Sequence, residues 1–110
     1  MNINTREENG FAVIELEGDV DLSCSPDARK SILDVLQENT NLLVDLANVT
    51  YIDSSGVASL VEGYQTAKKQ SLKFGLVGVS EAAMSVLKLA RLDKVFPIYT
   101  SIDEYTAEDA

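Results

Sequence analysis

Apolar residues along this chain follow two spacings, one typical of strands and one typical of helices. Residues 2–8 and 11–17 flank Asn9-Gly10, a pair that favours a two-residue hairpin turn, and Gly18 ends the second run. Beyond the hairpin, continuous apolar runs predict strands at 42–46, 72–79 and 95–99. Helical spacing predicts the segments between them to be helices, at 25–39, at 54–70 and from Ser80 to about Ala90. A short fourth helix is expected from Ser101, because Ser101 and Glu104 have capping-box spacing.

Strands that are separated by helices pair in parallel through right-handed crossovers. The tight turn at Asn9-Gly10 makes the first strand antiparallel to the second. The sequence therefore predicts an α/β fold with a mixed, mostly parallel sheet, an N-terminal β-hairpin and about four helices. At 110 residues the chain is long enough for one core, so a single domain over 1–110 is expected.

The helix starts carry capping signals. Ser25-Pro26 predicts an N-cap followed by proline at the first helical position, and Ser80 predicts the cap of the third helix. The second long helix has two candidate caps, Asp53 and Ser54, which the sequence leaves open. If Ser54 is the cap, replacing it by alanine costs about 0.5–2 kcal/mol.

Composition removes several classes of chemistry. The chain has no histidine, which excludes Ser-His-Asp and Cys-His catalysis and disfavours zinc sites. Its net charge of -9 and pI near 4.3 disfavour nucleic acid and anionic membranes as partners. A partner with a basic surface fits this charge, although the charge is equally explained as an aid to solubility.

Nothing in the sequence points to secretion or to a membrane. Cys24 is the only cysteine, so no intramolecular disulfide is possible. No apolar run approaches the roughly 20 residues of a membrane span, and the N-terminus lacks a signal-peptide pattern. A cytoplasmic location, without insertion into a membrane, is therefore expected.

The most informative motif is Asp53-Ser54-Ser55-Gly56, between a predicted strand and a predicted helix. A serine at a helix N-terminus meets free backbone N–H groups and the positive end of the helix dipole. That position suits a helix cap and equally suits a phosphoryl group. Glycine in a first helical turn indicates either a close approach of another backbone or tight packing within the domain.

Acidic residues follow the predicted strands at the same edge of the sheet. Asp19 and Asp21 follow the second strand, and Asp53 and Ser54 follow the third. Because sites in open α/β sheets form at the carboxyl ends of parallel strands, these four residues form a candidate cluster. Asp19 and Asp21 are equally explained as turn residues that bond to their own backbone. A divalent cation on the three aspartates would need a geometry that the sequence does not supply, so no metal or cofactor is predicted.

Three segments together resemble the STAS domain, and in particular the stand-alone bacterial anti-sigma factor antagonists. They are Gly18-Asp19-Val20-Asp21, Tyr51 to Gly56, and Leu87 to Phe96, which contains Leu92-Asp93-Lys94-Val95-Phe96. The resemblance covers nearly the whole chain in the same order. One departure is Val57-Ala58, where many members of the family carry Leu-Gly.

The resemblance implies a partner switch. An unphosphorylated antagonist binds an anti-sigma factor that is also a serine kinase, and thereby frees the sigma factor. The kinase phosphorylates the antagonist and the complex separates, and a serine phosphatase resets it. The phosphoacceptor corresponds to Ser54, and its acidic neighbours to Asp53 and Asp21. The expected partner-binding residues are Asp19, Asp21, Asp53, Ser54, Ser55 and Gly56.

Two other functions remain as alternatives. Similar STAS domains serve as accessory subunits of ATP-driven lipid transporters, where the domain docks a permease or ATPase at the cytoplasmic side of the membrane. An enzyme using Asp53 and Ser54 ranks last, because no histidine, suitably placed lysine or glycine-rich phosphate loop is present to activate the serine. Because these activating groups are missing, the protein is not expected to be an enzyme. The apolar faces are all accounted for within one domain, so the free protein is expected to be a monomer.

Overall fold

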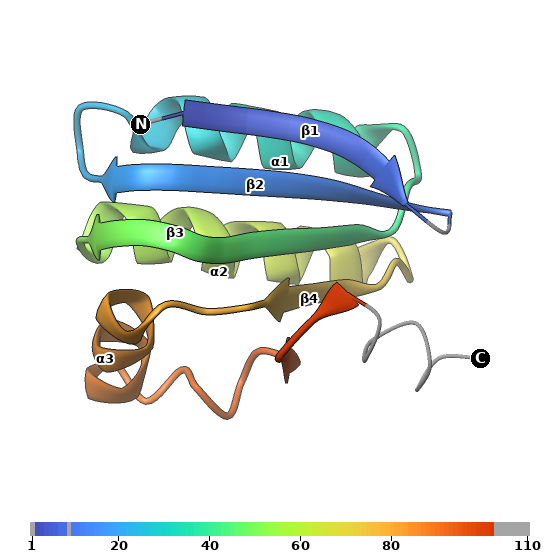
Figure 1. The fold of residues 1–110 in the computed structure, drawn as a ribbon. Helices are drawn as coiled ribbons and strands as arrows, with labels where there is room; N and C mark the ends of the chain where they lie inside the picture. The colour runs from blue at the N-terminus through green and yellow to red at the C-terminus, as the bar shows by residue number, and fades with distance from the viewer. Residues whose placement is uncertain (1, 9, 103–110) are drawn as a thin grey trace.

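The computed structural model describes residues 2–8 and 10–102 and shows an alternation of strands and helices (Figure 1). The elements, in chain order, are β1 (Asn2–Glu8), β2 (Phe11–Val20), α1 (Ser25–Gln37), β3 (Leu42–Ile52), α2 (Ser54–Lys69), β4 (Phe74–Val77), α3 (Glu81–Leu89) and β5 (Ile98–Tyr99). The predicted order of elements is confirmed. The predicted fourth helix from Ser101 lies almost wholly outside the described residues, which contain three helices.

One five-stranded sheet, in the order β1-β2-β3-β4-β5, forms the centre of the fold. β1 and β2 pair antiparallel with Glu8 opposite Phe11, and Gly10 between them has a positive φ of 85° that glycine adopts without strain. The remaining strands pair in parallel. The mixed, mostly parallel sheet with an N-terminal hairpin is therefore confirmed.

β3 is longer than the apolar run predicts. It continues from Leu46 to Ile52, and its pairing with β2 shifts register twice, between Glu15 and Glu17 and between Gly18 and Asp19. Each shift places an extra β3 residue against β2, as in a β-bulge. A bulge interrupts the alternation of buried and exposed positions, so the sequence pattern ended the strand six residues early. The extension carries β3 directly to Asp53.

The other strands and helix starts differ less. β4 and β5 are shorter than predicted, and α1 ends at Gln37 instead of Asn39. The expectation that Ser25 caps α1 is wrong: the N-cap is Cys24, and Ser25 is the buried first residue of the helix. The Asp21 carbonyl accepts the Ser25 N–H at 2.7 Å, so the preceding loop satisfies this donor. Ser80 does cap α3, where its hydroxyl accepts the Ala83 N–H at 3.2 Å.

The main core lies between the sheet and its helices. α1 and α2 lie side by side behind the sheet in Figure 1, and α3 packs on β3. Ala90, where the third predicted helix ends, is the C-cap of α3 and is exposed. Core side chains with at most 2% exposure include Ile14, Leu16, Ile32, Leu36, Leu42, Leu46, Ile52, Leu60, Leu76 and Leu87. A smaller apolar cluster, separate from this core, contains Phe11, Val13, Leu43 and Val77.

Candidate functional site

Asp53 is the N-cap of α2 and organises the first turn of that helix. Its Oδ1 accepts the backbone N–H groups of Ser55, at 2.9 Å, and Gly56, at 3.1 Å. The same oxygen accepts the Ser55 hydroxyl at 2.5 Å. These bonds satisfy donors that a helix N-terminus otherwise leaves free. Of the two caps left open by the sequence, the structure selects Asp53, so the capping cost expected for Ser54 does not apply.

Ser54 is the first residue of α2 and differs from its neighbour Ser55. Its side chain is exposed, and among the described residues its hydroxyl makes no hydrogen bond. The Ser55 hydroxyl is half-buried and is held by Asp53. The serine that is sterically and chemically available at this helix start is therefore Ser54.

Asp53 also joins the end of β2 to the start of α2. Its Oδ2 accepts the Leu22 N–H at 3.1 Å, and its own N–H donates to the Val20 carbonyl at 3.2 Å. Gly56 is buried at this junction, where an added Cβ would lie 2.7 Å from Ile52 Cγ1 and 3.0 Å from the Val20 carbonyl oxygen. Gly56 is therefore explained both by the close approach of another backbone segment and by tight side-chain packing.

Asp21 opens the loop between β2 and α1. Its Oδ1 accepts the Ser23 N–H at 3.0 Å and the Ser23 hydroxyl at 2.5 Å. Its carbonyl accepts the N–H groups of Cys24 and Ser25, and the Cys24 thiol donates to the Asp19 carbonyl at 3.2 Å. Asp21 therefore stabilises its own turn, which was one of the two explanations for this residue in the sequence. Its role in partner binding stays a prediction.

Asp19 has a different hydrogen-bond partner. Its carboxylate accepts the Thr50 hydroxyl at 2.7 Å, from the neighbouring strand β3. Among the described residues, the Asp19 carboxylate makes no hydrogen bond with Asp53 or Ser54. The described part of the chain also contains no group of three or more acidic or cysteine residues placed to hold a metal ion. Of the four predicted residues, the structure places Asp53 next to Ser54 at the start of α2, and the charges of Asp53 and Asp21 are close enough to interact.

The carboxylates of Asp21 and Asp53 are both stabilised in their charged form. The pKa of Asp53 is lowered, chiefly by the hydrogen bond from the Ser55 hydroxyl and further by backbone N–H donors. The pKa of Asp21 is lowered mainly by the Ser23 hydroxyl, although the nearby charge of Asp53 opposes the shift. At neutral pH both groups carry a negative charge, and that of Asp53 is on the residue directly before Ser54.

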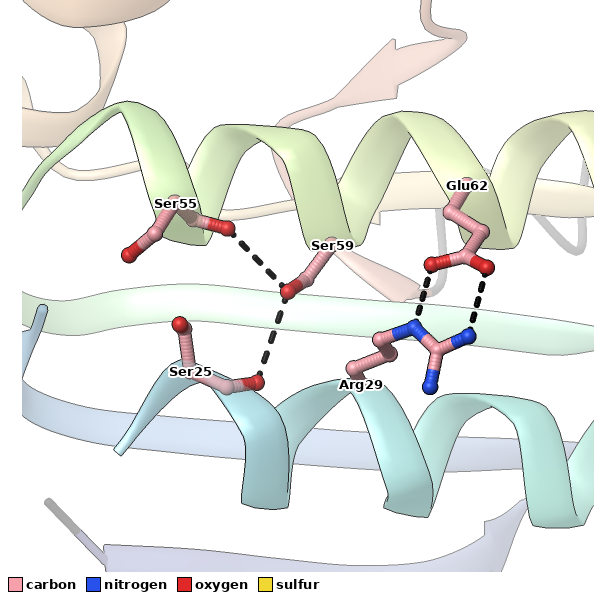
Figure 2. A network of polar contacts seen from close by, with 5 residues as sticks. All are labelled: Ser25, Arg29, Ser55, Ser59 and Glu62. Atoms are coloured by element: carbon pink, nitrogen blue, oxygen red, sulfur yellow. Dashed lines mark hydrogen bonds and ion pairs between the residues drawn. The ribbon is translucent and has the colours of Figure 1, made fainter. Parts of the chain in front are cut away.

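Hydrogen bonds and an ion pair join α1 to α2 (Figure 2). The buried Ser59 hydroxyl donates to the carbonyls of Ser55, at 3.2 Å, and Ser25, at 3.4 Å. One turn further along, the Arg29 guanidinium forms two hydrogen bonds to the Glu62 carboxylate, at 2.5 and 2.8 Å. The sequence analysis missed both contacts, because they join residues 33 and 34 positions apart.

Two exposed apolar side chains near the site were also missed. Leu22 follows Asp21 and is 73% exposed, and Tyr51 precedes Ile52 and is 51% exposed. The only sequence signal for Leu22 is a single apolar residue within a polar turn. An apolar residue in a turn can pack on the core or lie in solvent, so the sequence alone does not predict the exposure of Leu22.

The chain is similar in sequence to proteins of a known family. The STAS domain model matches residues 2–105. The anti-sigma-F factor antagonist RsfB of Mycobacterium tuberculosis is 29% identical over 107 residues, with 94% of this chain and 85% of the relative covered. The anti-sigma-B factor antagonist of Bacillus subtilis is 21% identical over 98 residues, covering 89% and 90%.

Solved structures give the same result. A crystal structure of an anti-sigma factor antagonist from Mycobacterium paratuberculosis superposes with a TM-score of 0.88 at 26% identity, with 97% of this chain and 92% of that chain covered. Within the described residues, no helix is both long enough and apolar enough to cross a membrane. On the match over residues 2–105, together with the shared sheet topology, the chain belongs to the STAS domain family.

Proposed function

We propose that this protein is a phospho-regulated anti-sigma factor antagonist. In its unphosphorylated form it binds an anti-sigma factor that is also a serine kinase, and so frees a sigma factor. Phosphorylation of Ser54 separates the complex, and a serine phosphatase acting in trans restores binding. The similarity to proteins named anti-sigma factor antagonists supports this role.

The observation that carries the proposal is the difference between Ser54 and Ser55. Ser54 offers a free, exposed hydroxyl at the first position of α2, whereas the Ser55 hydroxyl is bonded to Asp53. A kinase reaches an exposed hydroxyl without unfolding the helix. Ser54 is accordingly the proposed phosphoacceptor, and the surface around it the proposed contact with the kinase.

The effect of phosphorylation follows from charge. A phosphate adds about -1.5 to -2 charges. The N-terminus of α2 tolerates this addition because its dipole favours negative charge, so the fold is retained. A partner surface that fits a neutral hydroxyl beside Asp53 and Asp21 then meets additional negative charge and volume. The switch acts at the interface and requires no refolding.

The remaining parts of the proposal concern the whole protein. The chain acts as one domain over residues 1–110, as a monomer in the cytoplasm, and binds partners rather than catalysing a reaction. Its net charge of -9 suits a partner with a basic surface and disfavours nucleic acid. Of the predicted contact residues, Gly56 is buried and contributes by positioning the helix start, whereas the Asp19 carboxylate accepts a hydrogen bond from Thr50.

The test uses each serine-kinase anti-sigma factor of the same genome, incubated with ATP and the wild-type protein, Ser54→Ala or Ser55→Ala. We expect mass spectrometry to place a single phosphate on Ser54, and Ser54→Ala to bind a kinase without being released by ATP. Ser54→Asp should fold normally and bind poorly. A phosphate on Ser55, or Ser54→Asp binding as tightly as the wild type, would overturn the mechanism.

The transporter hypothesis is tested in the same study. Affinity purification of the tagged protein from its own cells should recover a kinase if the proposal is right. Recovery of a permease or transport ATPase, with no kinase able to modify Ser54, would replace the switch by an accessory role in transport. A kinase or permease gene beside this gene would point in the same direction as the recovered partner.

A further inference from the structure

We propose that Leu22 is an apolar contact of the same partner surface, so that the anti-sigma kinase recognises Asp21 and Leu22 together. The partner feature that fits this pair is a shallow apolar pocket bordered by a basic side chain. This inference rests on the proposed function and adds to it a residue that determines affinity.

The backbone of Leu22 is held from both sides. Its own N–H donates to Asp53 Oδ2 at 3.1 Å. The next residue, Ser23, donates to the Asp21 carboxylate, and the N–H groups of Cys24 and Ser25 donate to the Asp21 carbonyl. A loop fixed by these bonds presents its side chain in one place, so little ordering entropy is lost when a partner covers it.

Exposure alone does not single out Leu22, since isolated apolar residues are common on protein surfaces. Among the described residues, the large apolar side chains that are exposed are Leu22, Tyr51, Leu89 and Val95. Leu22 differs from the other three because its backbone is bonded to the carboxylate that directly precedes Ser54 in the chain. A kinase that reaches the Ser54 hydroxyl therefore comes close to Leu22.

Charge defines the rest of the partner surface. Asp21 directly precedes Leu22 in the chain, and Asp53 accepts the Leu22 N–H; both carboxylates have lowered pKa values and are ionised at neutral pH. A basic side chain on the partner meets these carboxylates, while apolar atoms cover the leucine. Affinity then comes mainly from burying the apolar side chain, and orientation from the charge pair.

The link through Asp53 also places Leu22 within the switch. The carboxylate of Asp53 holds the first turn of α2 through Oδ1 and the Leu22 loop through Oδ2. A phosphate on Ser54 repels this carboxylate, and the bond to Leu22 is the one that ties it to another segment of the chain. The partner therefore meets additional charge and volume at Ser54 and loses a well-placed apolar contact in the same event.

The experiment measures binding to the kinase by titration calorimetry, with Leu22→Ser, Leu22→Met and the control Leu89→Ser. Leu89 is 86% exposed at the end of α3 and provides the same chemical change at another site. Leu22→Ser should bind about ten- to a hundredfold more weakly, whereas Leu22→Met and Leu89→Ser should stay within about threefold of the wild type. Thermal melts of all three should match the wild type, because neither leucine belongs to the core.

Two results would overturn the inference: Leu22→Ser binding within about twofold of the wild type, or Leu89→Ser losing as much affinity as Leu22→Ser. Ser54→Asp is measured in the same titration to separate this inference from the proposed function. If Ser54→Asp binds poorly and Leu22→Ser binds normally, only the role of Leu22 is wrong. If the wild type binds no kinase, or Ser54→Asp binds as tightly as the wild type, the proposed function fails and Leu22 with it.

Discussion

Replacing Gly56 by alanine should destabilise the domain, even though alanine is the better helix former. The new Cβ would lie 2.7 Å from Ile52 Cγ1, 2.9 Å from Val20 Cγ1 and 3.0 Å from the Val20 carbonyl oxygen. Ile52 and Val20 are 2% and 1% exposed, so their side chains have little space into which to move. The carbonyl is fixed as well, because it accepts the Asp53 N–H at 3.2 Å.

The magnitude is a difference of two terms. Overpacking of this kind costs about 1–3 kcal/mol, while the change from glycine to alanine in a helix gains up to about 1 kcal/mol. The net loss is about 1–2 kcal/mol in the free energy of unfolding. For a chain of this length each kcal/mol lowers Tm by about 4 °C, so the expected drop is about 4–8 °C.

Thermal melts and urea titrations of Gly56→Ala measure this loss directly. The matched control is Ala58→Gly, at an exposed position two residues later in α2, which isolates the helix-propensity term. Adding the loss seen in Ala58→Gly to that of Gly56→Ala then gives the steric cost alone. A Gly56→Ala protein that melts at or above the wild-type temperature would refute the requirement for a close approach at this junction.

Two further changes test the capping contacts. Ser80→Ala should lower the free energy of unfolding by about 1–2 kcal/mol in urea titrations, because the Ser80 hydroxyl accepts the Ala83 N–H and donates to the Val49 carbonyl at 2.7 Å. The control Ser85→Ala, on the exposed side of α3, should be nearly neutral. Equal losses in the two variants would contradict the capping role. The pKa of Asp53 is lowered from 3.8 by its hydrogen bonds, so the stability that the Asp53 carboxylate contributes is present above pH 3.8 and is lost as the pH falls through the lower pKa of the folded protein. Asp53→Asn keeps a capping oxygen without titrating, so the fall in Tm below about pH 4 should be flatter in this variant. An unchanged fall in Tm would show that Asp53 does not contribute to the acid sensitivity.

Much of the fold was predictable because it depends on neighbours in the chain. The hairpin at Asn9-Gly10 follows from a local turn preference, and the parallel pairing from the alternation of strands with helices. The apolar faces of α1 and α2 were readable from helical spacing, since positions three and four residues apart share a face. The position of Ser54 at a helix start followed from the same periodicity, within one residue.

The errors have a common physical origin. β3 was ended too early because its continuous apolar run stops at Leu46, and two register shifts against β2 interrupt the pattern beyond it. Ser25 and Ser54 were each candidate N-caps on local pattern, and in both cases the cap is the preceding residue. A cap is decided by backbone geometry where two segments meet, and a helix boundary is uncertain by one or two residues in any sequence pattern.

The type and order of the elements, the apolar faces of the helices and the acidic residues after the strands could all be predicted from spacing along the chain. The pairing of the polar groups could not, because it depends on how the chain folds. Asp19 bonds to Thr50 and Leu22 to Asp53, in both cases 31 residues away, and no period in the sequence encodes such partners. The site around Ser54 is therefore a property of the packing that brings the ends of β2 and β3 together.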